Sequence, residues 1–201
     1  MDFTIIKANL EKLGYTVNCF ENKEQAAEYL VNAIQNTSVG FGGSMTSEEL
    51  GLYEKLAEKN EVYWHWKATE ELSPQQARTL ARDAKVYISS VNGAAKTGEL
   101  INIDGNGNRV AEIMYGHEKV YLIIGENKIE DDYEKALFRA RNIAAPLNAQ
   151  RLNKKTPCAI KADKCYNCKS PDRICCGLSV LWKSPAACEY EVILVNEKLG
   201  Y

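Results

Sequence analysis

The sequence predicts an α/β fold built on a mostly parallel sheet, and three observations lead to this prediction. Segments of strand-like composition alternate along the chain with segments of helical periodicity, which is typical of a parallel sheet covered by helices on both faces. The run Val120–Ile124 is apolar throughout, as expected of a strand that is buried on both sides. The chain has 201 residues, of which 45% are hydrophobic, so we expect one domain over residues 1–201.

The first half of the chain predicts four helices with strands between them. Apolar residues at helical spacing indicate helices over residues 3–13, 23–35 and 47–59. Gly14 suits the end of the first of these helices, and Ser73-Pro74 fits an N-cap and first-turn proline that open a further helix over residues 74–83. β-Branched and aromatic residues indicate strands over residues 15–20, 38–41, 61–66 and 86–90.

The second half of the chain adds a predicted β-hairpin insertion and a cysteine-rich loop. Asp104-Gly105-Asn106-Gly107 is strong turn chemistry, so we expect residues 99–103 to pair with residues 109–114. Strands are expected over residues 119–125 and 191–195, with a helix over residues 131–142 between them. We expect Ala145-Pro146 to break this helix before a further helical turn, and residues 156–177 to form a cysteine-rich C-terminal loop.

Composition and charge exclude several classes of function. The formal net charge is −2 and charged residues make up 26% of the chain, with the two signs interspersed, whereas nucleic-acid binders carry a basic excess. No segment approaches the roughly 20 apolar residues of a membrane-spanning helix, and the first residues lack the pattern of a secretory signal. We therefore expect a cytoplasmic protein that binds neither nucleic acid nor membrane.

The segment Val39–Glu49 is a glycine-rich loop between a strand and a helix. Its glycines would let the backbone approach a ligand closely, and the helix N-terminus that follows suits a phosphate or carboxylate. The loop lacks the Gly-Lys-Ser/Thr end of a Walker A motif. The alternative is a tight turn whose hydroxyl side chain only caps the helix. The residues that we expect to contact a ligand here are Gly42, Gly43, Ser44 and Thr46.

Two further polar loops follow the strands that end at Ser90 and Gly125. Arg109 offers a planar fork for a carboxylate or phosphate, and Asp104 and Glu99 are the candidate catalytic acid or base. Because parallel strands end at one edge of a sheet, all three loops should surround one pocket, although the turn sequence alone fits a plain hairpin. The expected ligand contacts in these two loops are Asn92, Thr97, Gly98, Asn102, Asn108, Arg109, Asn127 and Lys128.

The cysteines and histidines are the remaining candidate metal ligands. Four cysteines follow a C-x6-C-x2-C-x6-C pattern, and they are Cys158, Cys165, Cys168 and Cys175. Disulfides are disfavoured in the cytoplasm, so a metal-binding role explains this cluster of cysteines better than a packing role. Four thiolates suit zinc or an iron–sulfur cluster equally. The alternative is a set of free or partly buried thiols. His65 and His117 lack partners at metal-ligand spacing, so we expect structural or surface roles for them.

Several segments together resemble the LUD (lactate-utilisation, DUF162) domain family. They are Gly40–Thr46 with Glu49–Gly51, Asn92–Ala94 with Thr97–Leu100, Asn102–Val110, Tyr115-Gly116, Val120–Gly125 with Asn127–Ile129, and Ala144–Pro146. The resemblance implies a Rossmann-like architecture shared with ribose-phosphate isomerases, glucosamine-phosphate deaminases and CoA transferases (NagB/RpiA/CoA-transferase-like), in which the glycine loops form a pocket for an anion. Some family members are linked to lactate oxidation alongside iron–sulfur partner proteins, but not all members carry the cysteine-rich segment.

Three functions are consistent with these features, and they leave open whether the protein is an enzyme. The first is a redox-associated protein of the lactate-utilisation type that binds a small anionic metabolite, with a 4Fe-4S cluster or other metal on the four cysteines and an electron-transfer protein as partner. The second is an isomerase- or transferase-like enzyme that acts on a phosphosugar or acyl-CoA and carries a structural zinc. The third is a non-catalytic ligand-binding or assembly subunit.

Overall fold

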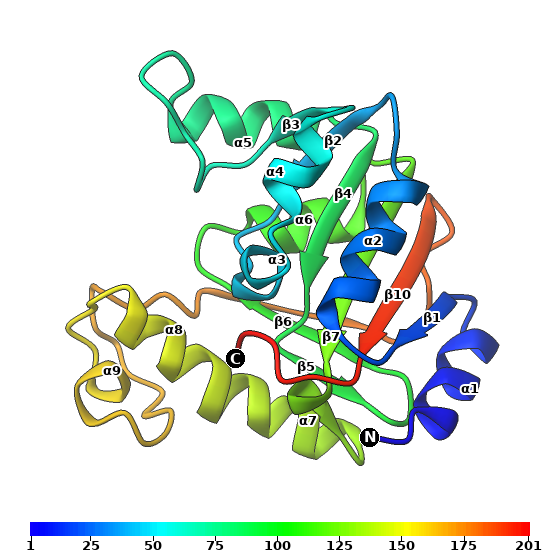
Figure 1. Ribbon diagram of the computed structural model, residues 1–201. Coiled ribbons are helices and arrows are strands. Elements are labelled where there is room, and N and C mark those ends of the chain that lie inside the picture. Colours follow the sequence, from blue (N-terminus) through cyan, green and yellow to red (C-terminus); the bar gives the residue numbers. More distant parts are fainter.

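A computed structural model describes residues 1–201. Its centre is a sheet of six strands in the order β1-β10-β7-β4-β2-β3 (Figure 1). The strands are β1 (Thr16–Phe20), β2 (Ser38–Phe41), β3 (Glu61–Tyr63), β4 (Val86–Ser90), β7 (Lys119–Gly125) and β10 (Glu189–Val195). All five pairings between these strands are parallel. The predicted α/β fold with a mostly parallel sheet is therefore confirmed.

Strand β7 lies inside the sheet, and its side chains enter two separate cores. Val120, Leu122 and Ile124 pack in the core on one face of the sheet. Tyr121 and Ile123 pack in the core on the other face. Since successive side chains of a strand point to opposite faces, burial on both sides requires an unbroken apolar run, which is what the sequence has.

Helices cover one face of the central sheet, and helices together with a second sheet cover the other. The first face carries α2 (Lys23–Ala33), α3 (Met45–Glu49) and α4 (Leu52–Ala57), and apolar residues of α2 and α4 join the same core. The second face carries α1 (Thr4–Lys12) and α6 (Asn108–Met114). Helix α5 (Pro74–Arg82) begins with the predicted cap, since Ser73 and Gln76 form a capping box.

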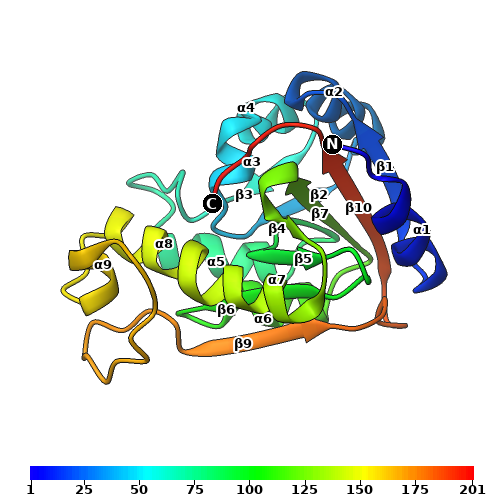
Figure 2. The same cartoon turned by 90° about the horizontal axis from the view of Figure 1, so that it is seen from below.

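The second sheet has four strands in the order β8-β5-β6-β9. The strands are β5 (Gly93–Ala95), β6 (Leu100–Asp104), β8 (Ile129–Glu130) and β9 (Gly177–Leu181). Figure 2 shows β9 running along the outer edge, and helix α7 (Tyr133–Arg139) lying against the sheet. The alanines of α7 and of the segment after it form a small third core with β5 and β6.

A hairpin insertion is present, but it is not the one that the turn sequence predicted. Strand β6 pairs with β5 and β9, both antiparallel, so both of its edges are occupied. Residues 109–114 belong instead to α6, which begins after Gly107 in a left-handed conformation with φ 82°. Ile113 of this helix is fully buried. Burial of an apolar residue at helical spacing thus prevailed over the turn signal.

Three other expected boundaries also moved. The helix expected over residues 47–59 is divided into α3 and α4 at Gly51, whose φ is 60°. The strand expected over residues 61–66 ends at Tyr63. The expected break at Ala145-Pro146 is absent, because α7 continues through a π-helical segment, Ala140–Ala144, into α8 (Ala145–Arg151). In that segment the Ala145 N–H bonds the carbonyl of Ala140, five residues back, and this wider turn accommodates the proline.

The predicted cysteine-rich loop contains one short helix, α9 (Pro157–Lys161). Elsewhere in the chain, a single 3-10 turn, Glu126–Lys128, follows β7. None of the helices combines the length and the hydrophobicity that crossing a lipid bilayer requires.

Candidate functional site

A cavity of about 660 Å³ opens at the carboxyl edge of the central sheet. The loops that follow β2, β4 and β7 meet there, as the parallel topology requires. Strand β6, α5, α8 and the cysteine-rich loop complete its walls. Of the residues predicted to contact a ligand, those that line it are Gly43, Ser44, Asn92, Asn108, Arg109 and Lys128, together with the predicted catalytic Asp104.

The first glycine loop gives space to its neighbours, and its Ser44 caps the short helix that follows. Helix α3 has only five residues, and the Ser44 hydroxyl already accepts the Ser47 N–H at 3.2 Å. A Cβ at Gly42 would lie 2.8 Å from the Ser89 hydroxyl and 2.9 Å from Cγ of Arg109. The absence of a side chain at Gly42 therefore lets Arg109 cross the end of the sheet.

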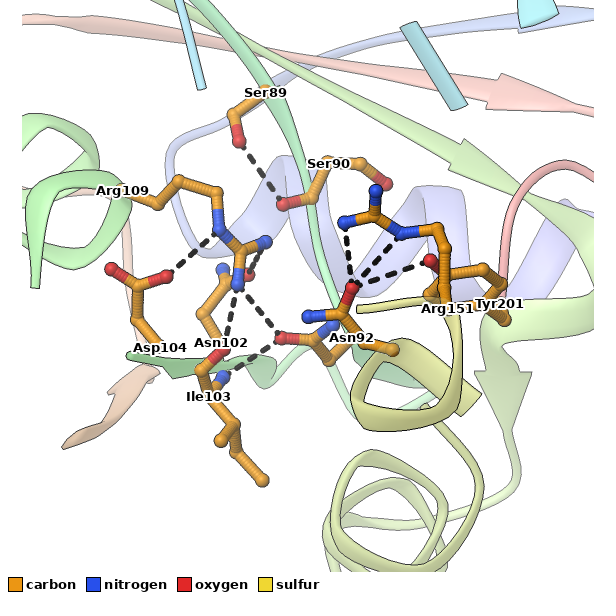
Figure 3. Close-up of polar contacts among 10 residues, drawn as sticks. Ser89, Ser90, Asn92, Asn102, Ile103, Asp104, Arg109, Arg151 and Tyr201 are labelled. Atoms are coloured by element: carbon orange, nitrogen blue, oxygen red, sulfur yellow. Dashed lines mark hydrogen bonds and ion pairs between the residues drawn. The ribbon is translucent and has the colours of Figure 1, made fainter. Parts of the chain in front are cut away.

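Arg109 lines the cavity and is fixed by four acceptors (Figure 3). Its Nε donates to Asp104 Oδ1 at 3.2 Å, and its Nη2 donates to the carbonyl of Ile103 at 2.6 Å. The amide oxygens of Asn92 and Asn102 each lie 3.4 Å from a guanidinium nitrogen. The second carboxylate oxygen of Asp104 is buried without a partner. This network leaves one buried acceptor atom without a donor beside a rigidly held cation.

Lys128 is buried, with 3% of its surface exposed. Its Nζ donates to the hydroxyls of Thr46 at 2.8 Å and Ser90 at 2.9 Å, and no carboxylate lies within ion-pair distance. Burial, followed by the nearby positive charges of Arg139 and Arg109, lowers the pKa of Lys128 to about 7. The charge of this amine therefore changes close to neutral pH.

Basic side chains outnumber acidic ones around the cavity. The basic residues of the lining are Arg78, Arg109, Lys128, Arg151, Lys154 and Arg173, and the acidic ones are Asp104 and Asp172. Nε of Arg78 is buried without a hydrogen-bond partner. The guanidinium of Arg151 lies over the ring of Trp66, 4.8 Å from its centroid. A concave site with such an excess of positive charge concentrates anions.

A family model for the LUD domain matches residues 4–195. The chain belongs to the LUD domain family. It also resembles the crystal structure of a DUF162 family protein from Deinococcus radiodurans, with a TM-score of 0.54 and 12% sequence identity over 97% of this chain and 99% of that one. At this identity the likeness shows the fold alone. A search of curated proteins found no match.

His65 lines the cavity of this LUD domain. Strand β3 ends at Tyr63, before His65 and Trp66, and both of these side chains line the cavity. Burial, reinforced by the charge of Arg78, lowers the pKa of His65 to about 4, so the ring is neutral at pH 7. His117 has the expected structural role, bonded to the Ala84 carbonyl at 2.6 Å.

Some predicted site residues of the LUD domain lie away from the cavity or reach it only through others. Thr97, Gly98 and Glu99 form the β5–β6 turn, where Thr97 donates to Glu99 and a Cβ at Gly98 would meet Leu13 of the α1 end. Because β6 runs from this turn to Asp104, a whole strand separates Glu99 from the cavity. Asn127 binds the backbone near the C-terminus instead, accepting the Leu199 N–H at 3.0 Å.

Thr46 and Asn102 contact the site indirectly, by accepting hydrogen bonds from Lys128 and Arg109 respectively. The sequence also gave no indication of several lining residues. Arg78 comes from α5, Arg151 from the end of α8, and Tyr201 from the last residue of the chain. An isolated basic residue on a helix is expected to be solvent-exposed, and only the tertiary arrangement brings these residues to the strand ends.

The four predicted metal ligands of the LUD domain are not assembled as a ligand set. Cys175 lies on the cavity wall and accepts from Nε of Arg173 at 3.1 Å. Cys165 and Cys175 also line an adjoining cavity of about 270 Å³. The thiols have suitable chemistry for zinc or iron, yet no group of three or more His, Cys, Asp or Glu side chains is placed to hold a metal. The metal site at Cys158, Cys165, Cys168 and Cys175 thus stays a prediction.

Proposed function

We propose that this LUD-family protein binds a small anionic metabolite, a carboxylate or phosphate, in the cavity at the strand ends. The observation that carries the proposal is that six basic side chains and only two acidic ones line the cavity. One of the basic side chains, Arg78, has a buried Nε without an acceptor. A buried N–H left unpaired costs about 1–3 kcal/mol. An anionic oxygen in the cavity would supply the missing acceptor.

Asp104 is the residue that we propose for proton transfer to or from the bound metabolite. Arg109 occupies one of its carboxylate oxygens, which fixes the group, and the other oxygen is free to accept a ligand hydroxyl. Glu99 lies at the far end of β6, so a Glu99/Asp104 pair is not available for isomerase- or transferase-like chemistry. Such chemistry would depend on Asp104 alone.

The test is titration of the protein with inorganic pyrophosphate by calorimetry, comparing Arg78→Met with Arg82→Met. Both arginines lie on α5, but Arg82 is exposed and paired with Asp83. Since a hydrogen bond to a charged group contributes about 1.5–3 kcal/mol, Arg78→Met should weaken binding roughly ten- to a hundredfold. Arg82→Met should leave the affinity within about twofold, since screened surface charges contribute little.

Two results would overturn this proposal. One is the absence of pyrophosphate binding to the folded protein at low ionic strength. The other is an equal loss of affinity in the two arginine variants, which would indicate general attraction to a positive surface. As a second control, Glu99→Gln should not change the affinity, whereas Asp104→Asn should change it, because only Asp104 lines the cavity.

We also propose that the cysteine-rich loop associates this site with redox chemistry, through a 4Fe-4S cluster or another metal and an electron-transfer partner. The support is the position of Cys175 on the cavity wall and the capacity of clustered thiolates for such centres. Anaerobically purified protein should contain iron and acid-labile sulfide, and Cys168→Ser should lose both while Cys19→Ser retains them. Zinc without sulfide would make the loop structural, and protein free of metal would refute the site.

A further inference from the structure

The hydrogen bonds of Lys128 leave one position of its nitrogen uncommitted. The Thr46 hydroxyl donates to the carbonyl of Leu199 at 3.3 Å, and the Ser90 hydroxyl donates to the carbonyl of Val91 at 3.4 Å. With their protons engaged, both hydroxyl oxygens accept from Nζ. Two N–H bonds are therefore used by the protein. The remaining tetrahedral position carries either the third proton or the lone pair, and Lys128 lines the cavity.

The charges around Lys128 favour the lone pair. The neighbours that act on it are two cations, Arg109 and Arg139, and one carboxylate, Glu49, which is exposed. Arg139 is itself buried and held by the carbonyls of Asn127 and Asn92 at 2.6 and 2.7 Å. It cannot move away from the amine without losing both bonds. A desolvated lysine beside fixed cations is the environment that makes an amine nucleophilic near neutral pH.

We propose that Lys128 is an amine nucleophile that forms an imine with the carbonyl group of the bound anion. The ligand class is thereby narrowed to a small anion that carries an aldehyde or ketone, such as a 2-oxo acid or a phosphorylated carbonyl compound. This inference rests on the proposed anion binding, since Arg109 and Arg78 would hold the negative group while the carbonyl faces Nζ.

The reaction balances without any further reagent. The Nζ lone pair forms a bond to the carbonyl carbon, and the C–O π bond breaks toward oxygen. The two protons of the neutral amine leave with that oxygen as water, and a C=N bond joins Lys128 to the ligand. No electrons are gained or lost, so neither an oxidant nor a reductant is consumed.

The experiment uses pyridoxal 5′-phosphate as the probe, because it carries a phosphate and an aldehyde. The folded protein is treated with limiting probe, reduced with borohydride and mapped by peptide mass spectrometry. Lowering a lysine pKa from 10.5 to about 7 raises the neutral fraction at pH 7 by roughly a thousandfold. Burial restricts access and so offsets part of this gain. We still expect Lys128 to be labelled at least tenfold faster than the other lysines. The rate should rise with pH to a plateau above about pH 7, and pyrophosphate should slow it.

The measurement is made on the unaltered sequence, so it does not depend on the folding of a variant. Labelling of Lys128 no faster than that of exposed lysines, in protein that binds pyrophosphate, would refute the nucleophile while leaving anion binding intact. Absence of pyrophosphate binding would instead refute the proposed function. Lys128→Met should remove the fast phase alone, and a fast phase that persists in this variant would also count against Lys128.

Discussion

Replacing Arg109 by methionine is expected to lower the free energy of unfolding by about 3–5 kcal/mol, which is the usual cost of removing one partner of a buried ion pair. Arg109 and Asp104 are 11% and 9% exposed at the side chain, so water cannot readily replace the guanidinium. Without it, Asp104 loses its one hydrogen-bond donor and the Ile103 carbonyl loses its 2.6 Å bond. Pyrophosphate binding should also fall at least a hundredfold, because Arg109 is the most rigidly held cation of the cavity.

Urea unfolding and pyrophosphate titration measure the two effects separately. Arg109→Met combined with Asp104→Asn should recover part of the stability, since the uncompensated charge is gone, but none of the affinity. Arg109→Lys should keep the charge yet lose the fork geometry, giving intermediate values for both quantities. Stability of Arg109→Met within 1 kcal/mol of the unaltered protein would show that the Asp104 network is not formed.

The central sheet could be predicted because its information is local. Strands β2, β4 and β7 begin and end where the sequence predicted them, since their apolar runs are bounded by polar or glycine residues. The errors occur where tertiary contacts decide. Ser38–Phe41 needs no partner to be recognised, whereas β5 and β8 have only three and two residues, and their existence depends on pairing within the second sheet.

The candidate site divides in the same way. Asn92 and Lys128 could be predicted because they follow β4 and β7, and parallel strands end at one edge. Asp104 and Arg109 lie further along the polar stretch after β4, at the end of β6 and the start of α6. Glu99 was misplaced, because the antiparallel return of β6 carries it to the opposite end of the second sheet. The contributions of α5 and α8 were missed altogether. The cavity takes Arg78 from α5 and Arg151 from α8, and nothing in helical periodicity identifies the direction in which a single arginine will face.

The largest effect of a small substitution is expected at Gly40, where β2 meets α5. A Cβ at this position would lie 2.3 Å from the carbonyl oxygen of Ala81 and 2.9 Å from its carbonyl carbon. These are backbone atoms, so no side-chain rotation can relieve the overlap, and α5 must move away from the sheet. Overpacking of a core costs typically about 1–3 kcal/mol and occasionally more. We expect Gly40→Ala to lie at or above the upper limit.

Because α5 carries Arg78 into the cavity, the same displacement should weaken pyrophosphate binding in whatever fraction of Gly40→Ala remains folded. Gly177→Ala is the matched control, since Gly177 also lies in a strand and a Cβ there meets nothing within 4 Å. The free energy of unfolding of this control should lie within about 0.5 kcal/mol of that of the unaltered protein. If urea unfolding gave the same stability for both variants, α5 could not be packed against β2 as closely as described. The route by which Arg78 reaches the anion would then have to be different.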